Sequence, residues 1–109
     1  MLLDPNKSLS PLALDVIRQL ITIYDPEMPV NIYDLGIIYD IEEDDARNIK
    51  VTMTLTSPNC PSIDDMINEI VYKVNQIEGI GKVDVNITFD PPWDSMMMSE
   101  EAQLMLGFL

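Results

Sequence analysis

Chemistry in this chain centres on Cys60, its only cysteine, which lies between Pro58 and Pro61. The residues that follow repeat apolar side chains every three or four positions, which predicts a helix beginning at about residue 63. Ser62 and Asp65 have the spacing of a capping pair for its first turn. Because a helix N-terminus stabilises anions, Cys60 is the candidate functional thiol. The alternative is a small buried cysteine without reactivity.

Several other side chains could assist a thiol at this position. Asp25 and Glu27 lie in a proline-rich loop, and Asp34 follows shortly after it. Carboxylates beside a thiolate could hold a metal ion transiently, although they also raise the pKa of the thiol. Their structural alternative is a role as loop caps and Asx turns. Thr56 is expected to donate a hydrogen bond near the thiol from the end of a strand.

The composition excludes several kinds of site. The chain has no histidine, so His-based catalytic triads and zinc sites built on Cys and His are excluded. Cys60 supplies one thiolate, whereas iron–sulfur clusters normally take four cysteine ligands. A metal or cluster would therefore need ligands from a second subunit, a partner or a small thiol. A thiol-dependent enzyme that uses Cys60 as nucleophile and a purely structural interaction module remain alternatives.

The charge and hydropathy of the chain limit its partners and location. Six Lys and Arg against nineteen Asp and Glu give a net charge of −13, which excludes a nucleic-acid-binding surface. No apolar run reaches the roughly 18 residues of a membrane span. The first residues lack the pattern of a signal peptide. We therefore predict a cytoplasmic protein, and a single cysteine suits a reducing compartment.

Hydrophobic periodicity predicts six elements in the order α-β-β-α-β-α. The helices are expected over 11–24, 63–77 and 100–106, and the strands over 35–41, 49–56 and 83–89, with a charged hairpin loop at 42–48. This order predicts a small two-layer α/β (α+β) sandwich, in which a three-stranded mixed sheet has helices packed on one face. Residues 1–8 are predicted to be a flexible arm and residues 9–109 a single domain. Three successive methionines at 96–98 cannot all face one core, so some exposure is expected.

Three strings make a resemblance specific: DPEMPVNIYDLGIIYDI, VTMTLTSPNCP and VDVNITFDPPW. Together they resemble the SufT/PaaD-like metal–sulfur cluster biosynthesis family over residues 25–106. The resemblance implies a maturation factor within or beside the SUF system, acting as a non-catalytic adaptor or transient carrier of iron–sulfur clusters. It implies SUF proteins, P-loop ATPase carriers and recipient apo-proteins as partners. It also implies that the protein binds no cofactor firmly and holds an iron–sulfur cluster or iron only transiently.

The same resemblance assigns residues by motif position. The characteristic positions of the family fall on Asp25-Pro26-Glu27, on Asp34-Leu35-Gly36, and on Thr56, Cys60 and Pro61. The cysteine of the family's Cys-Pro motif is regarded as its reactive residue, which agrees with the choice of Cys60. PaaD-like members carry a further cysteine-rich C-terminal region, whereas no cysteine follows Cys60 here, so a SufT-like protein is expected. Whether the protein forms a homodimer is left open.

Overall fold

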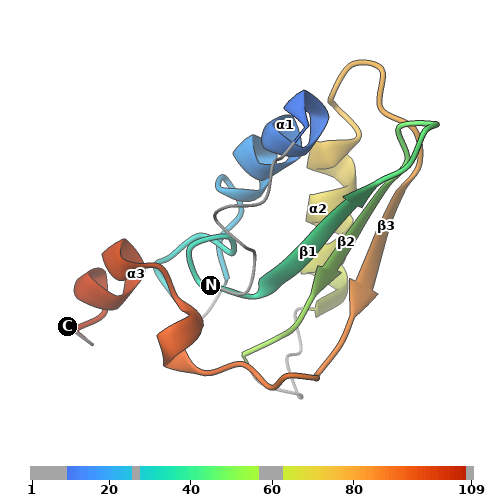
Figure 1. The fold of residues 1–109 in the computed structure, drawn as a ribbon. Helices are drawn as coiled ribbons and strands as arrows, with labels where there is room; N and C mark the ends of the chain where they lie inside the picture. The colour runs from blue at the N-terminus through green and yellow to red at the C-terminus, as the bar shows by residue number, and fades with distance from the viewer. Residues whose placement is uncertain (1–9, 26–27, 57–62, 108–109) are drawn as a thin grey trace.

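The computed structural model describes residues 10–25, 28–56 and 63–107, so the arm predicted for residues 1–8 lies outside the described residues. The elements are α1 (Pro11–Leu20), β1 (Ile38–Glu43), β2 (Ile49–Met53), α2 (Ile63–Val74), β3 (Val83–Ile87), the 3-10 helix η1 (Ser95–Met97) and α3 (Glu100–Met105) (Figure 1). Apart from the short η1, this is the predicted order. The predicted small α+β fold is confirmed.

The sheet has β2 at its centre, in the order β1-β2-β3. β1 pairs with β2 in antiparallel fashion, with Ile41 opposite Val51. β2 and β3 are parallel, with Val51 opposite Val85, and α2 connects them. The sheet is therefore mixed, as predicted.

The predicted ends of several elements were wrong by two to four residues. The first strand begins at Ile38 and not at residue 35, because residues 33–36 form a turn in which the Gly36 N–H donates to the Tyr33 carbonyl (3.1 Å). β2 ends at Met53 and β3 at Ile87, each before its alternating pattern ends. α1 and α2 end at Leu20 and Val74, where turns begin. The apolar periodicity of the sequence continues into these turns, whereas a helix or strand ends where its regular backbone hydrogen bonding stops.

Two helices begin at serines that cap them. The Ser10 hydroxyl accepts a hydrogen bond from the Ala13 N–H (3.0 Å) and donates one to the Glu43 carboxylate at the end of β1. The Ser99 hydroxyl accepts a hydrogen bond from the Ala102 N–H (3.2 Å). Each cap satisfies a backbone donor that the helix leaves unpaired, which stabilises it by about 1 kcal/mol. The predicted starts of both helices are confirmed.

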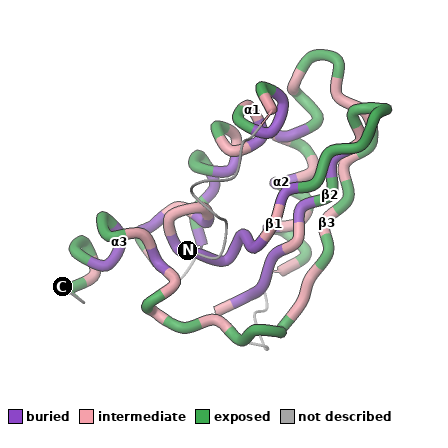
Figure 2. The backbone as a smooth tube through the Cα atoms, viewed as in Figure 1, coloured by how far each residue is buried: buried purple, intermediate pink, exposed green. Residues whose placement is uncertain are grey.

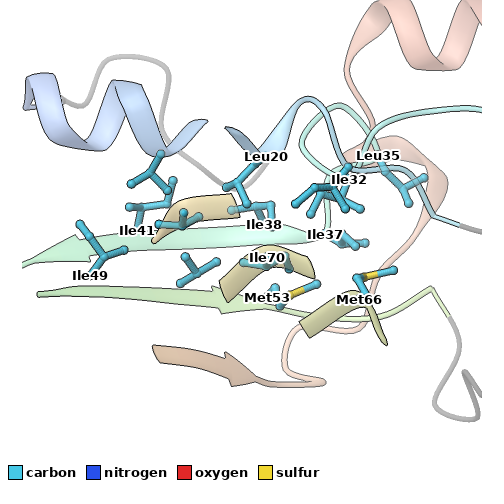
Figure 3. Close-up of a cluster of buried hydrophobic side chains, with 14 of the residues drawn as sticks. Leu20, Ile32, Leu35, Ile37, Ile38, Ile41, Ile49, Met53, Met66 and Ile70 are labelled. Atoms are coloured by element: carbon cyan, nitrogen blue, oxygen red, sulfur yellow. The ribbon is translucent and has the colours of Figure 1, made fainter. Parts of the chain in front are cut away.

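α1 and α2 cover one face of the sheet, and the core lies between the two layers (Figure 1, Figure 2). Leu20, Ile38 and Ile70 come from α1, β1 and α2 and are fully buried together there (Figure 3). Each such side chain stabilises the fold by about 1.5–3 kcal/mol relative to an exposed one. On the opposite face, Lys50 and Asp84 are paired in register and exposed. The core therefore lies between the helices and the inner face of the sheet, and the outer face carries polar side chains.

The C-terminal part of the chain does not join this helical layer. After β3, residues 88–99 pass around the end of the sheet where β1 begins, and α3 lies beyond that end (Figure 1). Met98 is buried, whereas Met96 has 74% of its surface exposed, in agreement with the expectation for the methionine run. None of the described helices is long and apolar enough to span a membrane.

Candidate functional site

The predicted thiol, Cys60, lies outside the described residues, as do Glu27 and Pro61. The elements on both sides of it are those predicted, since β2 precedes it and α2 begins at Ile63. Thr56, the last described residue before it, is half-buried. The described neighbours of the candidate site therefore lie at the end of the sheet where β2 finishes and β1 starts.

The first turn of α2 carries two carboxylates, Asp64 and Asp65, and both are exposed. Negative charges there interact favourably with the positive end of the helix dipole and stabilise α2 by some tenths of a kcal/mol each. They also compete with any other anion at this terminus. The capping partner assigned to Asp65, Ser62, lies outside the described residues. Any activation of a thiolate by this helix terminus is therefore opposed by two neighbouring carboxylates.

Asp25 lies inside a closed loop. The Ile32 N–H donates to the Ile23 carbonyl (2.8 Å), and the Met28 N–H donates to the Asp25 carbonyl (3.2 Å). Only 6% of the surface of Asp25 is exposed. Burying a carboxylate costs free energy unless it is bonded inside the protein. Its position therefore favours the loop-orienting role over that of a surface metal ligand.

Asp34 is held by a reciprocal pair of hydrogen bonds with Asn31. The Asn31 side-chain amide donates to Asp34 Oδ2 (2.7 Å), and the Asp34 N–H donates to Asn31 Oδ1 (2.9 Å). This is the Asx-type loop geometry that the sequence analysis gave as the structural alternative. The Asp34 carboxylate, together with burial, raises the pKa of neighbouring Tyr33, and burial is the larger cause. The loop thus fixes the position of one carboxylate that remains half-exposed.

The Asp34-Leu35-Gly36 motif contacts the C-terminal segment, which we define as residues 91–99. The Asp34 carbonyl accepts from the Ser99 N–H (2.8 Å), and the Leu35 carbonyl accepts from the Trp93 indole N–H (2.9 Å). Gly36 has φ +84, and a β-carbon there would lie 2.2 Å from the Met97 carbonyl oxygen. Each of the three motif residues therefore helps to dock the C-terminal segment. The sequence analysis did not predict this docking role.

Tyr39 adds a fourth contact to this segment. Its hydroxyl donates to the Pro91 carbonyl (2.7 Å). Burial raises the pKa of Tyr39, the hydroxyl of Thr54 opposes this rise, and Asp94 adds to it. Thr54 itself is fully buried, although the alternating pattern placed it with exposed Lys50. The sequence did not predict that Tyr39 and Trp93 position the C-terminal segment. The one signal for Trp93 was a single tryptophan that follows two prolines.

The described residues offer no metal site of their own. Among residues 10–25, 28–56 and 63–107, no three Cys, Asp or Glu side chains lie close enough to hold a metal ion. Asp25 and Asp34 are therefore not joined in such a group within the described chain. With a single thiol in the sequence, the donor set fits an incomplete site that needs ligands from elsewhere.

Two hollows on the described surface are relevant to the site. The larger, of about 330 Å³, lies at the far end of the sheet among mixed charges that include Glu42, Lys50 and Asp84. It lies at the end of the sheet where β2 begins, whereas Thr56 follows the other end of β2. The smaller, of about 80 Å³, lies between α3 and the loop that holds Asp34. We call it the α3 pocket.

The chain is similar in sequence to proteins of iron–sulfur maturation. A protein named "Fe-S protein maturation auxiliary factor" from Porphyromonas gingivalis is 50% identical over 95 residues, which cover 87% of this chain and 90% of that protein. "Fe-S protein maturation auxiliary factor SufT" from Staphylococcus aureus is 38% identical over 85 residues, which cover 78% of this chain and 97% of the relative.

A solved structure has the same fold. It is a "Domain of Unknown Function DUF59" from Bacillus anthracis, with a TM-score of 0.84 and 29% sequence identity over 90% of this chain and 93% of the other. A family model described as "Iron-sulfur cluster assembly protein" matches residues 4–99. The resemblance that the three sequence motifs carried is therefore confirmed, and the chain belongs to the iron–sulfur cluster assembly protein family.

Proposed function

We propose that this chain is an iron–sulfur maturation factor that assists the delivery of clusters to recipient proteins. The observation that carries the proposal is the family match over residues 4–99, together with the 50% identity to a maturation auxiliary factor. The fold agrees, since a solved DUF59 domain shares it with a TM-score of 0.84. Maturation is therefore the activity to test first.

Within that role, a non-catalytic adaptor or transient carrier fits the residues better than an enzyme does. The chain has no histidine to act as a base and no second cysteine to resolve a disulfide. The two acids in the first turn of α2 reduce the advantage that a helix terminus gives a nucleophilic thiol. These features favour a protein that presents a ligand and binds partners.

A transient cluster or iron ion would be cargo, with Cys60 as one thiolate ligand. The remaining ligands would come from a second subunit, a partner or a small thiol, since the described residues form no metal-holding group. Asp25 and Glu27 would orient their loop or assist the thiol as carboxylates, and Asp34 would hold the adjoining turn. Thr56 would donate a hydrogen bond near the thiol, and Pro61 would fix the backbone beside it.

The partners in this proposal are proteins of the iron–sulfur assembly machinery, including SUF proteins and P-loop ATPase carriers, and recipient apo-proteins in the cytoplasm. The net charge of −13 favours partners with basic surfaces and steers their approach. A homodimer is one way of completing the ligand set.

Anaerobic reconstitution tests the carrier version of the proposal. Purified protein is treated with iron and sulfide, and wild type is compared with Cys60→Ser by absorption spectra and native mass. A carrier binds a cluster only when Cys60 is present. If no cluster forms under any condition, the carrier version fails and the adaptor version remains.

Complementation tests the proposal as a whole. Cells of the source organism that lack the protein are expected to lose activity of iron–sulfur enzymes and to regain it with the wild-type chain. If the wild-type chain changes nothing in these cells, the proposed function is wrong.

A further inference from the structure

The α3 pocket is lined by both apolar and acidic side chains. Tyr24 and Met105 form apolar walls, although 58% and 67% of their surfaces are exposed. Asp34 and Glu101 bring two carboxylates to the same pocket. Exposed apolar patches often mark interaction sites, and tyrosine is enriched among the residues that dominate binding.

The loop and the helix that line this pocket are joined by hydrogen bonds within the chain. Asn31 fixes the Asp34 carboxylate through the 2.7 Å hydrogen bond. Glu101 and Met105 lie four residues apart on α3, and therefore on one face of the helix. The hydrogen bond from the Ser99 N–H to the Asp34 carbonyl joins the start of α3 to the loop. A preformed pocket loses little conformational entropy on binding.

The carboxylates of the pocket have no cation beside them among the described lining residues. Three of the basic side chains elsewhere have other contacts: Arg18 pairs with Asp15 (2.9 Å), Lys73 pairs with Glu69 (3.3 Å), and the Arg47 Nε–H donates to the Gly79 carbonyl (2.9 Å). Within the part of the chain that the structure describes, the negative charge of the pocket is therefore complementary to a basic group of a partner.

The size of the pocket determines the kind of ligand. At about 80 Å³ it is well below the roughly 300–1,000 Å³ of pockets that bury a cofactor or small metabolite. It can take the end of one side chain. Nucleic acid is excluded by the charge of −13.

We infer that the α3 pocket receives an arginine or lysine side chain from a protein partner. The aliphatic stem of such a residue packs against Met105, its cation lies near the Asp34 and Glu101 carboxylates, and the ring of Tyr24 offers a cation–π contact. The inference rests on the proposed function only in naming the partner as a protein of iron–sulfur maturation. Binding of a basic side chain can be tested without it.

The first test is a titration of the full chain, labelled with ¹⁵N, with N-acetyl-arginine amide and N-acetyl-lysine amide. N-acetyl-citrulline amide has nearly the shape of the arginine probe but no charge. A basic probe is expected to give saturable shifts at the amides of Tyr24, Asn31 and Glu101, to bind at least about tenfold more tightly than citrulline, and to weaken with added salt. Equal binding of citrulline, or shifts spread equally over acidic residues at the far end of the sheet, overturns the inference.

Two matched pairs of variants localise the binding. Glu100 and Leu104 are exposed on α3 but do not line the pocket, so Glu100→Lys and Leu104→Ser are controls for Glu101→Lys and Met105→Ser. Glu101→Lys is expected to weaken arginine binding by about tenfold or more, and Glu100→Lys to leave it within about twofold. Circular dichroism confirms that each variant folds. Equal loss in both members of a pair overturns the assignment to this pocket.

The same variants are then tested by complementation. If the wild-type chain and Glu100→Lys restore the iron–sulfur enzymes while Glu101→Lys does not, the pocket serves maturation. If Glu101→Lys restores them as well as wild type, its role in partner docking is wrong although the proposed function stands. If the wild-type chain restores nothing, the proposed function fails, and the titration alone decides whether the pocket binds a basic side chain.

Discussion

The backbone of Met97 lies directly against Gly36, so close that a β-carbon at Gly36 would be 2.2 Å from the Met97 carbonyl oxygen. The same glycine has φ +84, a region that other residues adopt only with strain. Two independent constraints therefore require glycine at the end of the Asp34-Leu35-Gly36 motif.

Gly36→Ala is expected to destabilise the protein by more than about 2 kcal/mol, since it adds a backbone clash to the strain of a positive φ. Gly79→Ala is the matched control, because Gly79 has φ +79 but a β-carbon there would meet only the Arg47 side chain at 3.7 Å. Urea unfolding followed by circular dichroism gives both values. Equal losses in the two variants would show that the Met97 contact adds nothing.

Trp93→Phe is expected to destabilise the docked C-terminal segment by about 1 kcal/mol, because it removes the indole donor to the Leu35 carbonyl. Tyr39→Phe removes the hydroxyl that donates to the Pro91 carbonyl and should cost a similar amount. Hydrogen exchange of the Ser99 amide, which is bonded to Asp34, reports undocking. Unchanged protection of this amide in both variants would contradict the docking role of the aromatic residues.

Neutralising the acids at the start of α2 is expected to make Cys60 more reactive. In Asp64→Asn/Asp65→Asn the helix N-terminus keeps its positive end without two competing anions, which favours the thiolate. The rate of alkylation by iodoacetamide at neutral pH should rise severalfold. Glu78→Gln, which removes one carboxylate beyond the other end of α2, is the control. An unchanged rate in the double variant would mean that the helix terminus does not act on Cys60.

The hairpin loop between β1 and β2 is expected to lose stability in acid. Hydrogen bonds from the Asn48 backbone and side chain, and one from the Ala46 N–H, lower the pKa of Asp44 below the ordinary value of an aspartate. The folded pKa lies below the unfolded one, so the contribution is complete above about pH 4 and is lost as the pH falls through the folded pKa. Amide exchange of Ala46 and Asn48 should accelerate over that range in wild type. In Asp44→Asn it should depend less on pH, and Asp45→Asn should behave as wild type.

Local patterns along the chain predict the elements and their order. Alternating residues in 49–53 and 83–87 and an apolar stripe in 63–74 are local signals, and the structure confirms the elements that they predict. The three motif strings also determined the family, since they needed no knowledge of contacts. The ends of the elements were less certain, because apolar periodicity continues for a few residues after backbone hydrogen bonding stops.

The tertiary structure alone decided what the motif residues contact. Asp34, Leu35 and Gly36 are over fifty residues away in the chain from Trp93, Met97 and Ser99, and no local pattern links the two segments. The α3 pocket arises from the same juxtaposition, which brings Glu101 and Met105 to the loop of Tyr24 and Asp34. Such contacts depend on how the chain closes over the end of the sheet, because packing acts between distant residues whereas periodicity and capping act between neighbours.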